Sequence, residues 1–255
     1  TSPSEKHDAD GWDRSYAQLD KWREKVPESA AARLVEAMFM IEESREIRRS
    51  KLDSRDPVAM VRIAANRMKE AREHLLEIKK IASHDPHWYM LMGQTGLYLG
   101  QSRNEFFLMM EEGYDRHPQY LELYHIAIRY INANWPNDDS LYEAMANSAL
   151  ARTEASEGMA LYARVYWLAY SHRDQLRLVS RSAPHWDKMK KGMDDVLKKY
   201  PDEWNIQNFA FFSCRIRDKK KTKELLELIE SPPILQAWRH PEAFGYCRSL
   251  ANEAS

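Results

Sequence analysis

The chain has 255 residues and a formal net charge of −1, with 44% of its residues hydrophobic and 30% charged. This length allows one large or two small domains with a real core, and the composition excludes a disordered chain. The balanced charge argues against a nucleic-acid binder, and no apolar run approaches the roughly 18 to 20 residues of a membrane span.

Helix-forming residues dominate the chain. Glycine is scarce, at 8 residues, while Ala, Leu, Glu, Lys, Arg and Met are plentiful. One predicted helix, over residues 57–83, is unusually long for a repeat unit. The hydrophobic patterns predict helices over residues 10–24, 28–50, 57–83, 87–100, 105–114, 119–133, 138–152, 157–171, 184–199, 204–216, 221–230 and 241–252.

Prolines recur with a regular spacing. The intervals are 30, 29 and 32 residues in the first half and 31 near the end: Pro27, Pro57, Pro86 and Pro118, then Pro201 and Pro232. Because proline is tolerated at the first helical position and nearby acids complement the helix dipole, these prolines are interpreted as helix starts. A period near 30 to 34 residues with helix–turn–helix content is typical of tetratricopeptide-like solenoids.

The sequence therefore predicts an all-α fold, a tetratricopeptide-like α-solenoid of stacked antiparallel helix pairs. We expect a single helical-repeat domain over residues 1–255. The capped turn WPNDDS (Trp135–Ser140) marks a seam that would divide it into an N-terminal half, 1–135, and a C-terminal half, 136–255.

One predicted helix, within YPDEWNIQNFAFFSC (Tyr200–Cys214), is apolar on nearly every side. Such a helix is expected to be buried on several sides, as an inner helix of a stack would be. Cys214 and Cys247 are too few for a disulfide scaffold and lack the spacing of a metal site. They form one bridge between neighbouring helices or lie as separate buried thiols, and the buried thiols are favoured because free cysteine is often buried.

This stretch also carries a family resemblance. With Trp186–Lys190 upstream, it resembles an uncharacterised bacterial family, a domain of unknown function with tetratricopeptide-like helices. The segments EGMALYARVYW (Glu157–Trp167) and NANWPNDDSLYEAMA (Asn132–Ala146) follow the same pattern, although Asn137 stands where the family tends to have glycine. The matching positions are Trp186, Met189, Lys190, Tyr200, Pro201, Asp202, Asn208, Phe209, Ala210 and Cys214.

The resemblance implies the helical fold and a soluble bacterial protein, and it implies no activity. The compartment stays open between cytoplasm and periplasm. The chain begins with Thr, so a processed start with a signal peptide removed is one reading, and a trimmed end is the other.

Sites for chemistry are weakly indicated. His84, Asp85 and His87 stand close together, but they are interpreted as a helix N-terminus capped by Asp85. Glu122 and His125 have a Glu-x-x-His spacing without a second copy. Because nucleophile motifs and Gly-rich phosphate loops are absent from the sequence, no catalytic residue, metal or cofactor is predicted. The basic run DKKKTK (218–223) is interpreted as an exposed turn.

Aromatic and arginine residues gather on the helices expected to lie inside the stack. Repeat proteins bind through the face that their inner helices line, and Tyr, Trp and Arg most often dominate binding. The same aromatics, at helical spacing, also fit ordinary packing between helices. The predicted partner-binding residues are Tyr124, Arg129, Tyr162, Arg164, Tyr170 and His172.

The leading functional prediction is a non-enzymatic module that binds a protein or peptide, one form of which is a bacterial adaptor or a toxin-neutralising (immunity) protein. The alternative is a hydrolase or metal-dependent enzyme with its site inside the helical curve, around His125, His172 and Glu122. A second rival is a small-molecule or lipid carrier, which requires a closed apolar cavity.

Overall fold

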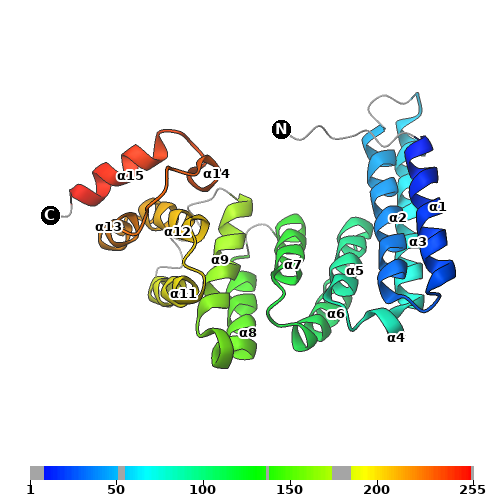
Figure 1. Cartoon of the computed structure of the whole chain (residues 1–255), viewed down its shortest axis with the longest axis horizontal. Helices are drawn as coiled ribbons and strands as arrows, with labels where there is room; N and C mark the ends of the chain where they lie inside the picture. The colour runs from blue at the N-terminus through cyan, green and yellow to red at the C-terminus, as the bar shows by residue number, and fades with distance from the viewer. Residues whose placement is uncertain (1–8, 51–54, 136–137, 174–184, 254–255) are drawn as a thin grey trace. The chain divides into compact units, whose positions relative to one another are not determined.

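The computed structural model describes residues 9–50, 55–135, 138–173 and 185–253, without the side chains of residues 9, 10 and 171–173. Within these ranges the chain forms fourteen helices and no strand (Figure 1). The all-α prediction is therefore confirmed. The chain divides into two compact units, Thr1–Ala127 and Ile128–Ser255, and the division falls inside α7 (Leu121–Asn134).

The first unit is built on α2. This helix packs against α1, α3 and α5, while α5 also contacts α3 and α6. Contacts between Arg33 and His74, and between Glu43 and Arg67, show that α2 and α3 run antiparallel. The helices of this unit are α1 (Ala9–Lys25), α2 (Ala30–Ser50), α3 (Pro57–Glu77), α4 (Lys79–Ala82), α5 (Pro86–Leu99), α6 (Arg103–Arg116) and the first half of α7.

Of the four prolines predicted to start helices in this unit, two do so, whereas the other two lie in turns that precede α2 and α7. Pro57 and Pro86 lie in the first turns of α3 and α5. In each case the aspartate before the proline, Asp56 or Asp85, caps the helix by accepting a hydrogen bond of 2.9 Å from a backbone N–H. This arrangement satisfies one of the free donors at the helix start, and it confirms the capping role predicted for Asp85.

The long helix predicted over residues 57–83 is wrong, because α3 and α4 are separate helices. Between them Ile78 has φ −87° and ψ 2°, outside the region of a regular α-helix. The side chains of Ile78 and Ala82 are buried. The hydrophobic pattern alone does not reveal this bend.

The second unit is centred on α12. This helix contacts α11, α13, α14 and α15, while α9 packs against α8 and α11. Every residue from Ile206 to Cys214 is buried, which confirms that this helix is covered on several sides. The helices of this unit are the rest of α7, α8 (Ser140–Glu157), α9 (Ala160–Arg173), α11 (Trp186–Lys199), α12 (Glu203–Arg215), α13 (Lys219–Leu226), α14 (Leu235–Trp238) and α15 (Ala243–Asn252).

A buried glutamine on α12 fixes the segment that contains α14. Gln207 is fully buried, and its side-chain oxygen accepts hydrogen bonds from the backbone N–H of Ile234 (2.7 Å) and from Trp238 Nε1 (2.8 Å). Its Nε2 donates to Glu203 and to Ser231 Oγ. Because a buried polar group must find partners, this side chain selects one path for residues 231–238.

A disulfide joins α12 to α15. Cys214 and Cys247 are bonded, with their Cα atoms 5.6 Å apart, and both are buried. The favoured interpretation of two separate thiols is therefore wrong, although their predicted burial is confirmed. The sequence left this open because the pairing depends on where the chain after α13 places α15, and no local pattern encodes that path.

Candidate functional site

The three tyrosines predicted to bind a partner are buried. Tyr124 donates a hydrogen bond to the carbonyl oxygen of Pro118 (2.8 Å) and stacks on Tyr114. Tyr162 donates to Glu143 (2.8 Å). The hydroxyl of Tyr170 accepts a hydrogen bond from Arg215 Nε at 3.3 Å. Their rings belong to the packing between helices in this structure.

The other predicted residues lie in different surroundings. Arg129, on α7, is exposed. Arg164, on α9, is half-buried, and its guanidinium carbon lies 5.2 Å from the centre of the Tyr200 ring. The side chain of His172 lies outside the part that the structure describes. Tyr124 belongs to the first unit and the remaining five to the second, and the contacts of the described tyrosines and of Arg164 involve different neighbours.

The residues of the enzyme alternative are only partly described. Glu122 Oε2 lies 3.1 Å from His125 Nδ1, one helical turn apart on α7, and more than half of the Glu122 side chain is exposed. His172 belongs to the other unit and its side chain is not described. This alternative therefore stays a prediction.

A polar cluster that the sequence did not predict surrounds Glu143 on α8. Tyr162 Oη lies 2.8 Å from its carboxylate, while His185 Nδ1 and Lys188 Nζ lie 3.3 Å and 3.6 Å away. The cluster therefore joins α8 and α9 to the start of α11. Among the described residues, the groups facing the carboxylate are Asn147, Tyr162, Tyr166, His185 and Lys188.

The charges in this cluster are mutually compensated. Burial raises the pKa of Glu143, but hydrogen bonds from Tyr166, Tyr162 and Asn147 outweigh it, and the pKa falls below its ordinary value. Burial, and then the carboxylate, raise the pKa values of both tyrosines. Glu143 is thus ionised and both phenols are neutral at pH 7. Because these groups satisfy one another, the cluster fits a role in holding three helices together.

The residues that carry the family resemblance also have structural roles. Trp186 Nε1 donates a hydrogen bond of 2.7 Å to Asp218, and Lys190 Nζ lies 3.8 Å from the same carboxylate. Asp202 caps the start of α12, and Cys214 forms the disulfide. The motif therefore describes how α11, α12, α13 and α15 are joined, and it identifies no reacting group.

The basic run before α13 has two kinds of lysine. Lys221 is only 5% exposed, and its Nζ lies 2.5 Å from both Asp194 and Glu224. The interpretation of this run as a simple exposed turn is therefore wrong, because Lys221 is buried and its ion pair with the exposed Asp194 joins α13 to α11. By contrast, Lys223 is exposed and borders a cleft.

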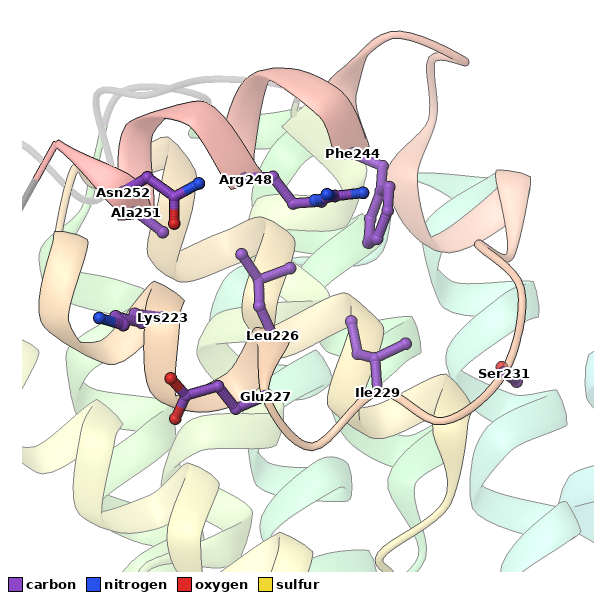
Figure 2. A pocket seen from close by; sticks show the side chains of 9 residues that line it. All are labelled: Lys223, Leu226, Glu227, Ile229, Ser231, Phe244, Arg248, Ala251 and Asn252. Atoms are coloured by element: carbon purple, nitrogen blue, oxygen red, sulfur yellow. The ribbon is translucent and has the colours of Figure 1, made fainter.

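This cleft lies between α13 and α15 in the second unit, and we call it the α13–α15 cleft (Figure 2). Its volume is about 370 Å³. Leu226, Ile229 and Phe244 are its large apolar side chains, and its charged side chains are exposed. It is open to solvent and is no closed cavity. The lining residues are Lys223, Leu226, Glu227, Ile229, Ser231, Phe244, Arg248, Ala251 and Asn252.

Long-range contacts build the walls of this cleft. The disulfide at Cys247 holds α15, and Gln207 fixes the chain at Ser231. Within α15, the guanidinium carbon of Arg248 lies 5.7 Å from the centre of the Phe244 ring. The only signal in the sequence was the run of charged and apolar residues after Asp218, which does not show that α15 lies opposite.

None of the helices in the described part of the chain is long and apolar enough to cross a membrane. Within the same residues, no group of three or more His, Cys, Asp or Glu side chains is placed to hold a metal ion. Comparisons with models of known protein families, with curated proteins and with solved structures gave no match. Within the described residues, the α13–α15 cleft is the candidate site that the geometry offers.

Proposed function

We propose that this chain is a non-enzymatic, tetratricopeptide-like protein that binds a peptide segment of a partner protein in the α13–α15 cleft. The observation that supports this function is a cleft in which three half-buried apolar side chains, Leu226, Ile229 and Phe244, lie next to exposed charged side chains. Binding sites combine apolar contact area with a few polar groups that fix orientation. A volume of about 370 Å³ suits a few side chains of a peptide.

Two features favour the repeat architecture within this proposal. Many successive helices pack as neighbours, such as α2 with α3 and α8 with α9, and α12 is covered on several sides, as an inner helix of a stack is. We include in the proposal the bacterial family that Tyr200–Cys214 resembles. The open cleft is a poorer fit to the carrier alternative, which needs an enclosed cavity.

The test is selection of ligands from a phage-displayed library of random short peptides, with the full chain as bait. Enriched peptides are synthesised, and their affinity is measured by fluorescence anisotropy. We expect Leu226→Lys to weaken binding by at least about tenfold, because a charge replaces an apolar contact. Phe244→Ala, which adds no charge, should weaken binding in the same direction.

The matched control is Leu228→Lys, since Leu228 is 48% exposed and does not line the cleft. It should change affinity by no more than about twofold. Circular dichroism and thermal unfolding establish that each variant is folded. Selected peptides that bind both lysine variants equally well, or that lose affinity only with Arg164→Ala, would place the binding surface elsewhere and contradict the proposal.

A further inference from the structure

The charges of the α13–α15 cleft are unequal. Lys223 on α13 and Arg248 on α15 provide two positive charges, while Glu227 provides one negative charge. Within the described residues, none of the three lies within ion-pair distance of an oppositely charged side chain. This contrasts with Lys221, only two residues before Lys223, which contacts two carboxylates. The cleft therefore retains a net positive charge that the fold has not neutralised.

Arg248 lies against one of the apolar side chains of the cleft. Its guanidinium carbon lies 5.7 Å from the centre of the Phe244 ring, one helical turn earlier on α15. Figure 2 shows Arg248 beside Phe244, across from Leu226. An aromatic ring favours a cation at this distance, and the contact leaves the planar N–H donors free for hydrogen bonding. A guanidinium held in this way matches the geometry of a carboxylate.

Glu227 occupies a different end of the cleft. It lies on the same side of Leu226 as Lys223, whereas Arg248 lies beside Phe244 (Figure 2). At that end the charges of Lys223 and Glu227 offset each other, whereas a ligand carboxylate near Arg248 would be attracted. The charge pattern thus gives an acidic ligand one preferred orientation.

We propose that the α13–α15 cleft selects a peptide segment in which an acidic side chain, Asp or Glu, is next to a large apolar one. The apolar side chain packs on Leu226, Ile229 and Phe244, and the carboxylate accepts hydrogen bonds from Arg248. The net positive charge of the lining speeds association with an acidic segment. This inference rests on the proposed function and names the ligand class of the same site.

The first measurement is the sequence composition of the selected peptides. We expect enrichment of Asp or Glu beside Leu, Ile, Phe, Tyr or Trp. One enriched peptide is then compared with a copy in which the acid is replaced by its amide, Glu by Gln or Asp by Asn. The amide copy should bind the wild type at least about tenfold more weakly, because a charge-assisted hydrogen bond is lost.

Charge reversal at Arg248 makes the test specific. With Arg248→Glu, the acidic peptide should lose affinity, and the amide copy should bind as well as the acidic one or better. Lys220→Glu is the matched control, because Lys220 is an exposed residue of α13 outside the cleft lining and its replacement changes the net charge equally. It should keep the preference for the acidic peptide.

The outcomes separate this inference from the proposed function. Peptides that Leu226→Lys disrupts but that show no acidic preference, or whose acid is insensitive to Arg248→Glu, would overturn the inference and leave the peptide-binding function standing. If no selected peptide responds to Leu226→Lys, the proposed function itself fails. Equal losses with Lys220→Glu and Arg248→Glu would indicate general charge attraction and would also overturn the inference.

Discussion

Two neighbouring stretches of the second unit show polar residues in two different roles, although Lys221 in the later stretch is also paired by the fold. In residues 158–218, polar side chains form hydrogen bonds that hold the fold together. Trp186 donates one to Asp218, and the backbone N–H of Met159 donates one to Asp195. In residues 219–252, exposed charges such as Arg248 lie beside a cleft without an ionic partner in the described residues. The first stretch contains the motif that carries the family resemblance, and the second contains the candidate site.

This difference teaches that a specific pattern of residues is no guide to function by itself. Tryptophan, glycine and aspartate at fixed spacing are needed wherever helices approach closely or a buried polar group must be satisfied. A binding surface has the opposite signature, since its groups are satisfied only when a ligand is present. Variants that change the free energy of unfolding without changing peptide affinity, or the reverse, therefore test this difference between the two stretches.

The largest expected effect comes from the disulfide that joins the two stretches. Replacing both Cys214 and Cys247 by Ser should lower the free energy of unfolding by roughly 3–4 kcal/mol, because the bond closes a loop with a sequence separation of 33. The loss should concentrate in α15, whose ten residues form a helix too short to be stable alone. Hydrogen exchange is the measurement, and α15 amides should exchange faster than those of α9.

Reduction of the wild-type protein is the control for this prediction. It should reproduce the exchange pattern of the double Ser variant and leave that variant unchanged. If α15 exchanges at the same rate with and without the disulfide, noncovalent contacts suffice to hold this wall of the cleft. In that case the disulfide is not needed to hold α15 in its place beside α13.

A smaller effect is expected at Gly192 in the motif-bearing stretch. A Cβ atom there would lie 2.5 Å from the carbonyl oxygen of Met159 and 2.7 Å from Ala163 Cβ, so α11 would have to move away from α9. Gly192→Ala should therefore destabilise the protein by about 1–3 kcal/mol, as overpacking does. Thermal and urea unfolding measure this change, while affinity for a cleft peptide should stay constant for the folded fraction.

The same substitution at Gly245 provides the matched control. A Cβ there meets no atom within 4 Å, and alanine favours helix by about 0.5–1 kcal/mol over glycine. Gly245→Ala should thus leave stability unchanged or raise it. Destabilisation by both substitutions would show that close approach of α9 and α11 is not the reason for glycine at Gly192.

The sequence predicted what depends on local chemistry. Scarce glycine and the apolar periodicity predicted an all-helical chain, and Asp85 before Pro86 predicted a helix start. Prediction from the sequence failed where segments distant in the chain come into contact. The disulfide at Cys247, the bend at Ile78 and the partners of Glu143 all depend on which helices become neighbours. The cleft was missed for the same reason, because its two walls are separated in the chain by α14 and its flanking turns.

The smallest expected effect concerns Glu143 and pH. Burial raises its pKa, but hydrogen bonds from Tyr166, Tyr162 and Asn147 lower it more, so the folded-state pKa lies below the ordinary 4.5. A depressed pKa stabilises the folded state above pH 4.5, and this contribution is lost as the pH falls through the folded-state value. Glu143→Gln should therefore cost about 1 kcal/mol near neutral pH, and less below pH 4.5.

Urea unfolding of wild type and Glu143→Gln across this pH range measures the difference directly. Peptide affinity serves as the second readout, because the cluster joins α8, α9 and α11 and contains no residue of the cleft lining. A stability difference that is constant with pH would mean that the carboxylate acts by shape alone. If the fully folded Glu143→Gln variant lost peptide affinity, the comparison would fail. A side chain whose hydrogen bonds are satisfied within the fold would then also contribute to ligand binding.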